Sequence, residues 1–402
     1  MSERNENRPG YKKTKVGWIP VEWGVKLVGQ LCSFTSGNGF RPRDWSQKGL
    51  PIIRIQNLNK GRKFNYFAGE PKSSWLVFPG DLLFAWAGVK GVSFGPTIWD
   101  GPKGVLNQHI YKVHPFPEVH TDWLFLALIR VTEKVERKAH GFKHSLLHVH
   151  KSDITGQNLP FPSLSEQKKI AEILSTWDKA IDQTRRLIDA KKRRKKALMQ
   201  QLLTGEKRLP EFNGTWAECS LGDVFNERRE VNGHNLQLLA ITGSRGVIPA
   251  SEIERKDSSN PDKSKYKIIR KGDVGYNTMR MWQGVSAVSD LDGIVSPAYT
   301  ICIPKEDVNV RFMGYFFKFP PIVYLFWRYS QGLVSDTLNL KFNNFAKIKV
   351  TIPGLKEQQA ITKVLSSADN EIVTLEKKLT ALEKQKRGLM QKLLTGEVRV
   401  KV

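Results

Sequence analysis

The sequence predicts an α+β chain in which two mixed α/β domains are separated by a long coiled coil of two helices. Three observations support this fold class. A long segment is repeated without a gap, each copy carries a heptad pattern, and strand-like runs precede each copy. We expect domain 1 at residues 1–160, a central helix at 161–206, domain 2 at 207–351 and a C-terminal helix at 352–402.

The repeat relates residues 162–206 to residues 353–397 at a constant offset of 191, and both copies end in Leu-Leu-Thr-Gly-Glu. The segments before the two copies keep only a skeleton in common, such as GDLLF at 80–84 and GDVGY at 272–276. This organisation indicates one scaffold that is written twice and carries two different surfaces.

Each copy shows a seam of apolar residues with alternating steps of four and three, which is the signature of a coiled coil. Pro162 and Pro353 mark the expected helix starts, and Gly205 and Gly396 mark the expected ends. The obvious partner for each helix is the other copy in the same chain. Another protein or a second copy of the chain would be the alternative partner. The seam residues are Ile170, Leu174, Trp177, Ile181, Thr184, Ile188, Lys191, Lys195, Leu198 and Leu202 in the first copy, and Ile361, Leu365, Ala368, Ile372, Leu375, Leu379, Leu382, Lys386, Leu389 and Leu393 in the second.

A basic run, KKRRKK at 191–196, lies inside the first helix. It could contact a phosphate backbone or an acidic partner. The interpretation that we favour is a solvated face with ion pairs to acidic residues of the second helix, such as Asp369, Glu371 and Glu376.

The charge balance points to a polyanionic partner. The chain of 402 residues has 64 Lys and Arg against 39 Asp and Glu, a net charge of +25. The helical segments 166–206 and 357–397 carry only +5 and +1 of this, so most of the excess lies in the two domains. A generally basic soluble protein, or one that binds an anionic membrane surface, could carry the same excess.

Several features fit a cytoplasmic protein without membrane segments. Three Cys lie far apart and form no CxxC pair, which fits a reducing compartment. The polar N-terminus does not resemble a signal peptide. The apolar run at 315–327 is too short to span a bilayer and is interrupted by Lys318 and two prolines, so we interpret it as buried core.

Both domains contain mixed strand and helix patterns. Strands are expected at 51–58, 80–86 and 107–113 in domain 1, followed by a helix at 122–139. Domain 2 repeats the pattern with strands at 237–242, 273–279 and 298–303 and an aromatic run at 311–329.

Polar, basic and aromatic loops connect these elements and form the expected DNA-binding surface. Arg and Lys recognise guanine in the major groove, Asn and Gln recognise adenine, and Ser and Lys commonly bind phosphates. Any single one of these residues could equally be part of a solvated loop. The candidates are Ser36, Arg41, Arg43, Gln56, Asn57, Lys60, Trp86, Lys90 and Lys143 in domain 1, and Arg245, Asn277, Arg280, Trp282, Gln283 and Gln331 in domain 2.

No catalytic constellation stands out from the sequence. A GxxxxGK[ST] phosphate loop is missing, and VSPAY at 295–299 lacks the second proline of the amino-methyltransferase box. His144 and His148 would share a helix face, but no carboxylate or Cys is spaced to complete a metal site. We therefore expect no catalytic residues, metal or cofactor in this chain, and a catalytic engine on another polypeptide.

The two repeated segments and the stretches before them carry a family resemblance. PFPSLSEQKKIAEILS…LMQQLLTGEKRL and TIPGLKEQQAITKVLS…LMQKLLTGEVRV resemble the central and C-terminal conserved regions of the specificity subunit of type I restriction–modification enzymes. GDLLFAWAG…VLNQHIYKV and GDVGYNTMRMWQG…GIVSPAY resemble stretches of the target recognition domains of that family. The resemblance covers nearly the whole chain.

The resemblance implies a non-catalytic subunit that reads a bipartite site in double-stranded DNA, one half with each domain. It implies that the two helices pair antiparallel as a spacer, that two methyltransferase subunits bind with S-adenosylmethionine, and that two motor-nuclease subunits join with ATP and Mg²⁺. The matching helix-start and partner-docking residues are Pro162, Leu164, Glu166, Gln167, Pro353, Leu355, Glu357 and Gln358. A fused methyltransferase or nuclease with unrecognised motifs, or a coiled-coil adaptor that binds only proteins, is the alternative.

Overall fold

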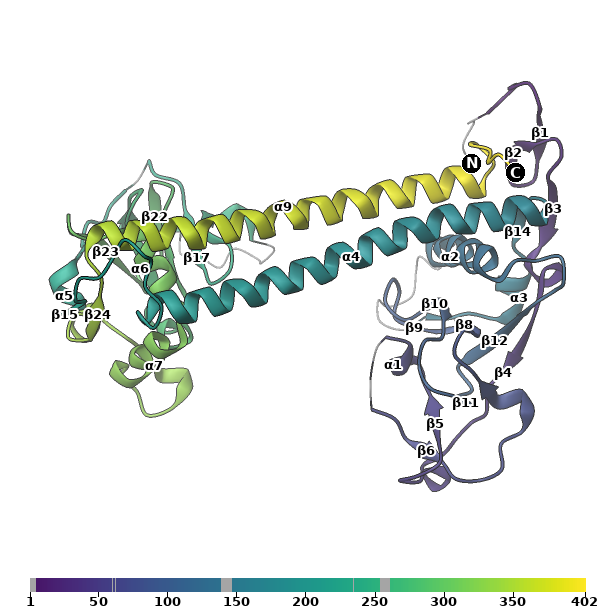
Figure 1. Ribbon diagram of the computed structural model, residues 1–402, viewed down its shortest axis with the longest axis horizontal. Helices are drawn as coiled ribbons and strands as arrows, with labels where there is room; N and C mark the ends of the chain where they lie inside the picture. The colour runs from purple at the N-terminus through teal and green to yellow at the C-terminus, as the bar shows by residue number, and fades with distance from the viewer. Residues whose placement is uncertain (1–4, 60, 62, 139–146, 234, 254–260) are drawn as a thin grey trace. The chain divides into compact units, whose positions relative to one another are not determined.

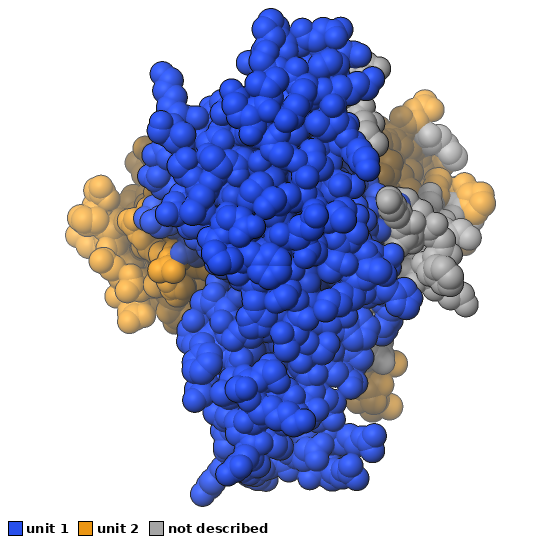
Figure 2. All heavy atoms as spheres, turned by 90° about the vertical axis from the view of Figure 1, so that its right-hand side faces the viewer, with its two compact units in different colours: residues 1–184, 378–402 blue, residues 185–377 orange. Residues whose placement is uncertain are grey.

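The computed structural model describes residues 5–59, 61, 63–138, 147–233, 235–253 and 261–402 (Figure 1). The chain divides into two compact units, which Figure 2 colours separately. Unit 1 consists of residues 1–184 and 378–402, and unit 2 consists of residues 185–377. Each unit therefore holds one globular domain and one half of each long helix.

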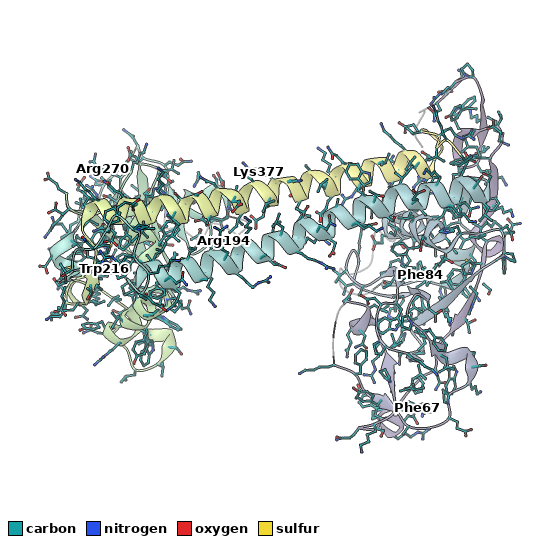
Figure 3. The ribbon with its side chains drawn as sticks, in the orientation of Figure 1. Phe67, Phe84, Arg194, Trp216, Arg270 and Lys377 are labelled. Atoms are coloured by element: carbon teal, nitrogen blue, oxygen red, sulfur yellow. The ribbon has the colours of Figure 1, made fainter. Side chains whose placement is uncertain are left out.

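Unit 1 is built on two four-stranded sheets, ordered β10-β8-β12-β4 and β6-β5-β11-β7. The helix α2 (Thr121–Lys138) contacts the first sheet at β10. Phe84, labelled in Figure 3, is fully buried in this core. The elements are β1 (Tyr11–Thr14), β2 (Gly17–Pro20), β3 (Gly24–Leu27), β4 (Cys32–Ser36), β5 (Leu50–Ile53), α1 (Ile55–Leu58), β6 (Tyr66–Phe67), β7 (Leu76–Val77), β8 (Leu82–Ala85), β9 (Ala87–Gly88), β10 (Gly95–Ile98), β11 (Gly104–Leu106), β12 (Ile110–Pro115), β13 (Leu147–His148), α3 (Lys151–Thr155) and β14 (Asn158–Phe161).

Unit 2 is built on one four-stranded sheet, ordered β16-β23-β20-β21, with three additional two-stranded pairs, β15–β24, β17–β18 and β19–β22. An aromatic core fills the space between this sheet and its helices, with Phe317, Phe326 and Phe345 in mutual ring contact. The elements are β15 (Ala217–Ser220), α5 (Leu221–Val224), β16 (Phe225–Glu227), β17 (Leu239–Thr242), β18 (Gly246–Pro249), β19 (Lys267–Ile269), β20 (Val274–Asn277), β21 (Ser286–Val288), β22 (Gly293–Val295), β23 (Tyr299–Pro304), α6 (Val310–Phe316), α7 (Pro320–Tyr329), α8 (Phe342–Phe345) and β24 (Lys349–Ile352).

The repeated segments form two helices of 40 residues each, α4 (Leu164–Leu203) and α9 (Leu355–Leu394). They pair within the chain and run antiparallel, because within unit 2 Lys191 pairs with Glu371 while Lys195 pairs with the earlier residue Asp369. The predicted seam residues are all buried or half-buried. The predictions of a coiled coil and of intramolecular pairing are confirmed.

Glycine ends both long helices, as the sequence predicts. Gly205 and Gly396 have φ values of 72° and 71°, in the left-handed region that glycine adopts without a steric penalty. At Gly396 a side chain is also excluded by space, since a Cβ would lie 2.4 Å from Pro20. The repeated Leu-Leu-Thr-Gly-Glu motif is thus a helix-stop motif.

The basic run at 191–196 supplies ion pairs inside unit 2. Lys192 pairs with Glu376 at 2.7 Å, and Lys195 pairs with Asp369 at 2.6 Å. Arg194, labelled in Figure 3, is exposed on α4. The three acidic partners are those that the sequence indicated, so the structural interpretation of this run holds.

Two local predictions need correction. The strand predicted at 51–58 ends at Ile53, and residues 55–58 form the short helix α1, because Asn57 accepts a hydrogen bond from the backbone N–H of Arg54 and caps a turn. The run at 315–327 is not entirely core. Tyr324 and Trp327 are 57% and 49% exposed on the outer face of α7, where they stack.

Candidate nucleic-acid interface

Several loops of unit 1 meet at one end of its sheets. Asn107 connects these loops, because its backbone N–H donates to the carbonyl of Ile53 and its backbone forms a parallel β-bridge with Asn38. The loop after β4 approaches so closely that a Cβ on Gly37 would lie 2.2 Å from the carbonyl oxygen of Leu106. The segments that follow β4, β5 and β11 are therefore held together as one surface.

The loop that follows β8 joins the same surface through Trp86. Its indole N–H donates to the carbonyl of Gln108 at 3.1 Å, and its ring packs against His109 and Tyr111. The predicted residues Ser36, Arg41, Arg43, Gln56 and Lys90 are exposed, and Trp86 is half-buried. Two further predicted residues, Lys60 and Lys143, lie outside the described residues.

Asn57 has a different role from the predicted base contact. Only 5% of the residue is exposed. Its amide nitrogen donates to the carbonyls of Gly61 and Lys63, and its amide oxygen accepts from the backbone N–H of Arg54. Asn57 therefore shapes the loop, and its polar atoms face inward.

Sequence reasoning missed a stacked pair on this surface. The guanidinium of Arg54 lies 4.4 Å above the ring of Trp45, and burial lowers the pKa of Arg54. Such cation–π pairs present a flat cationic surface that suits nucleic-acid recognition. Because Arg54 stands at the end of an apolar strand, its sequence context indicated a strand residue and carried no sign of this role.

Unit 2 brings its predicted loops together in the same way. The segment after β20 is bound to the segment before β23, because Thr278 donates from its backbone N–H to the carbonyl of Ala298. Leu340 in turn donates from its N–H to the carbonyl of Thr278. The 3₁₀ turn η5 (Met281–Gln283) packs against α7. The loops carrying the predicted residues thus form a second surface.

The predicted residues of unit 2 lie on this surface but differ in how exposed they are and in which contacts they make. Arg280, Gln283 and Gln331 are exposed, while Asn277 and Trp282 are half-buried. The Trp282 indole donates to the carbonyl of Met279 at 3.0 Å, which fixes its ring inside the turn. Arg245 is exposed but pairs with Glu252 at 2.6 Å, so a DNA contact would compete with this ion pair.

The predicted helix-start residue Glu166 forms a hydrogen-bonded cluster with Trp23 and Arg399 in unit 1, which we call the bracket. Glu166 is 3% exposed and accepts hydrogen bonds from the indole of Trp23 at 3.0 Å and from the Arg399 guanidinium at 2.8 Å. Arg399 lies just beyond the end of α9, so the bracket joins the start of one long helix to the tail of the other.

Unit 2 repeats the bracket, with its Glu and its Arg each 191 positions from their counterparts and Trp216 193 positions from Trp23. Glu357 is 4% exposed and accepts from Arg208 through Nε and Nη2, and from the indole of Trp216 at 3.2 Å. Trp216 is labelled in Figure 3. Because these carboxylates are enclosed within their own units, any contact with a partner at the helix starts would have to come from neighbouring exposed side chains such as Leu164, which is 38% exposed.

The glutamines of the motif fasten the domains to the helices. Gln167 accepts from the backbone N–H of His120 at 2.8 Å and donates to the carbonyl of Pro162 at 3.0 Å. Gln358 makes the corresponding bonds with Asn309 and Pro353, both at 2.8 Å. The Pro-x-Leu-x-Glu-Gln motif therefore orients each domain on its end of the helix pair.

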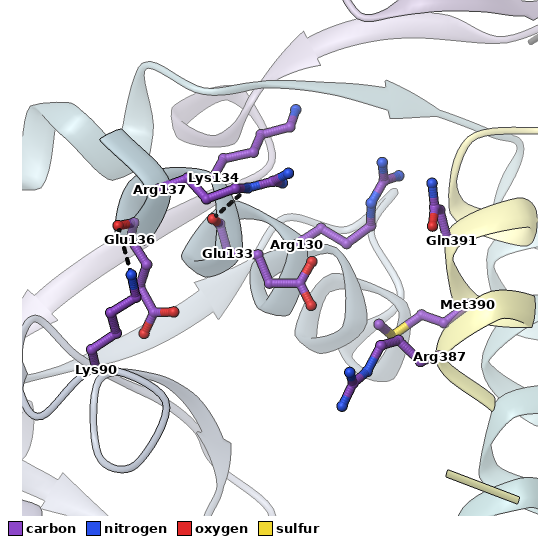
Figure 4. A pocket seen from close by; sticks show the side chains of 9 residues that line it. All are labelled: Lys90, Arg130, Glu133, Lys134, Glu136, Arg137, Arg387, Met390 and Gln391. Carbon is purple, nitrogen blue, oxygen red and sulfur yellow. Dashed lines mark hydrogen bonds between the residues drawn. The ribbon is translucent and has the colours of Figure 1, made fainter. Parts of the chain in front are cut away.

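A basic pocket of about 380 Å³ lies in unit 1 between α2 and the last turns of α9 (Figure 4). Lys90, Arg130, Arg137 and Arg387 line it, with Glu133 and Glu136 beside them. Burial lowers the pKa of Arg130. The cationic lining suits an anionic group. The predicted residue Lys90 is part of this lining, and its ammonium donates to the carbonyl of Glu136.

Two negative findings concern the described residues alone. Within them, no helix is long and apolar enough to cross a membrane. Across the same part of the chain, His, Cys, Asp and Glu side chains form no cluster of three that could hold a metal ion. His144, one of the two histidines considered above, lies outside this part.

The chain is similar to known proteins along nearly its whole length. A specificity subunit of the type I restriction enzyme MjaVIII from Methanocaldococcus jannaschii is 24% identical over 95% of this chain and 94% of its own length. The EcoBI specificity subunit from Escherichia coli is 21% identical over 95% of this chain and 86% of its own length.

Solved structures show the same fold. The type I restriction-modification S subunit from M. genitalium superposes with a TM-score of 0.55 and 16% identity, covering 92% of this chain and 96% of that one. A chain from a study of complex assembly and conformational transition of the type I R-M system gives 0.59 and 16%, covering 94% and 99%. The type I restriction modification DNA specificity domain matches residues 20–191 and 213–384, and this chain belongs to that family.

Proposed function

We propose that this chain is the DNA-recognition subunit of a type I restriction–modification complex and that each unit reads one half of a bipartite site in double-stranded DNA. The observation that carries the proposal is the duplicated scaffold. The brackets at Glu166 and Glu357 are equivalent, whereas the loops presented by the two units differ. A common framework with two unlike surfaces fits a site with two unlike halves.

The catalytic steps belong to other polypeptides in this proposal. Two methyltransferase subunits, which bind S-adenosylmethionine, would dock on the helix pair and the adjoining domain surfaces. Two motor-nuclease subunits, which use ATP and Mg²⁺, would join them in the cytoplasm. The chain itself would supply sequence recognition and no catalytic residue.

The decisive experiment is to map methylated adenines in the genome of cells that express this chain with its methyltransferase subunit. A two-part motif with an unread spacer is expected. Purified chain alone, given S-adenosylmethionine, Mg²⁺ and DNA, should neither methylate nor cleave. Activity of the isolated chain would refute the proposal in favour of a fused enzyme.

The spacer length is expected to follow the helix length. Inserting one matched heptad into α4 after Arg185 and another into α9 after Lys377 keeps the seam in phase and lengthens each helix by about 10 Å, which corresponds to about three base pairs of duplex. Methylome sequencing of the variant should show the same half-sites with a longer spacer.

A shorter variant of this experiment inserts four residues into α4 alone, which adds about 6 Å and is expected to lengthen the spacer by roughly two base pairs. If the double-heptad variant methylates sites with the original spacing, the helices do not set the spacer.

A further inference from the structure

Lys318 lies between α6 and α7 of unit 2, and the sequence indicated it only as an interruption of the apolar run at 315–327, without a role in binding. Its ammonium donates three hydrogen bonds, to the carbonyls of Gly243 at 3.1 Å, Gly284 at 2.9 Å and Ser286 at 2.6 Å. An ammonium group has three donors, so Lys318 uses all of them on backbone oxygens.

The three acceptors belong to the predicted DNA-binding loops. Gly243 precedes Arg245 in the turn between β17 and β18. Gly284 ends η5, whose flanking residue Arg280 and terminal residue Gln283 are exposed. Lys318 thus connects two loops that are more than 30 residues apart in the chain.

The geometry of Gly284 makes this connection stiff. Its φ is 75°, in the left-handed region, and its backbone N–H donates to the carbonyl of Met281 at 2.7 Å. A Cβ at this position would lie 3.1 Å from the side chain of Val323 in α7. With its N–H held by η5 and its carbonyl held by Lys318, Gly284 has the peptide groups on both of its sides fixed.

The site is built to hold a charge. Lys318 is half-buried, and burial lowers its pKa to about 8. Most of the population still carries the ammonium at neutral pH, and three carbonyl dipoles compensate for the lost water. The enclosed position of the ammonium distinguishes Lys318 from the exposed lysines that bind phosphates.

We infer that Lys318 is a positioning residue for base recognition by unit 2, holding the 243–245 turn and η5 at a fixed spacing so that Arg245 and Arg280 meet the DNA together. The inference rests on the proposed function, because it assigns base reading to these loops. A loop that is merely tethered loses entropy on binding, whereas a preorganised one has already lost it.

The test is the variant K318M, which keeps an unbranched apolar side chain that is one heavy atom shorter and removes all three donors. With the full chain in its methyltransferase complex, binding is measured to duplexes that carry single substitutions in either half-site. We expect discrimination in the half-site read by unit 2 to fall roughly tenfold, with the other half-site and the slope of affinity against salt unchanged.

The control variant is K349M, since Lys349 is an exposed lysine of the same unit that pairs with Glu218. It should leave discrimination in both half-sites unchanged. Hydrogen exchange supplies a second readout that does not require DNA. Peptides over 242–246 and 277–288 should exchange faster in K318M, while peptides over β23 keep their protection.

Two results would overturn the inference. A uniform loss of affinity for all sequences with a shallower salt dependence would make Lys318 a phosphate contact. Faster exchange throughout unit 2 would make it a general structural residue. If K318M does not fold, K318Q, which keeps two donors, is measured against the same outcomes. Wild-type protein without any sequence discrimination would refute the proposed function, while the exchange experiment would still show whether Lys318 holds the two loops in place.

Discussion

Replacing Glu357 with alanine is expected to destabilise unit 2 by about 3 kcal/mol, which is the effect of breaking a buried ion pair. The carboxylate side chain is 5% exposed and that of Arg208 is 27% exposed. Without Glu357, the guanidinium and the indole N–H of Trp216 both lose their acceptor in a place that water reaches poorly. Because Arg208 keeps some solvent contact, the expected value lies at the lower end of the range for buried pairs.

Differential scanning calorimetry should show this as a transition of unit 2 that is lower by about 6–12 °C, since a unit of this size shifts by about 2–4 °C per kcal/mol. The equivalent variant E166A should give a smaller shift in unit 1, because its partner Arg399 is 38% exposed.

The matched control is E218A, which breaks the pair with Lys349. Those side chains are 65% and 72% exposed, so the expected loss is below about 1 kcal/mol. If E357A and E218A destabilised the chain equally, the bracket would have no special role, and the glutamate of the motif would behave as an ordinary surface residue.

The large-scale organisation could be predicted because it depends on local and periodic patterns. A heptad seam sustained over a whole helix allows little beyond a coiled coil, and a glycine after the last seam leucines indicates a left-handed stop. Because the segment is repeated, each of these inferences applies to both copies. These features depend on neighbours along the chain, which a sequence displays directly.

The roles of individual polar residues could not be predicted, because they depend on partners far away in the sequence. Glu166 was expected to form part of a docking framework, yet its partners are Trp23 and a tail residue more than 200 positions later. Asn57 resembled a base-reading amide until its neighbours were seen to use all of its polar atoms. The heptad seam predicts a helix, but it does not predict which side chains are buried at the ends of that helix.

The apolar run at 315–327 shows that composition alone does not predict which apolar side chains are buried. Its composition is typical of core, and Phe316, Phe317 and Phe326 are buried as expected. The helix α7 nevertheless presents Tyr324 and Trp327 to solvent, because only one face of a helix of ten residues can pack on η5 and α8. A sequence run indicates the amount of apolar surface, and the fold decides how much is covered.

Changing Arg280 to alanine is expected to relax specificity at a single base pair in the half-site read by unit 2. The side chain is exposed at the start of η5, and its backbone is fixed by bonds from its N–H to the carbonyl of Asn277 and from the Gln283 N–H to its own carbonyl, both at 3.0 Å. A rigid backbone that carries an exposed guanidinium suits the recognition of guanine through two hydrogen bonds.

The expected cost is about 1–3 kcal/mol at that position, or roughly five- to 150-fold in affinity, with other positions unchanged. Competition binding with duplexes substituted one base pair at a time measures it directly. The control is R270A, because Arg270 is an exposed arginine of the same unit that pairs with Glu230 and lies in the turn before β20. R270A should bind every duplex as the wild type does.

The pattern of loss decides what Arg280 contacts. If Arg280 contacts a base, R280A lowers the affinity for the cognate duplex. The affinity for the duplex that is substituted at the contacted base pair hardly changes, so the two affinities become similar. A phosphate contact lowers affinity for all duplexes by the same factor and reduces the salt slope by about one. The second pattern would contradict the assignment of Arg280 as a base-reading residue while leaving DNA recognition by unit 2 intact.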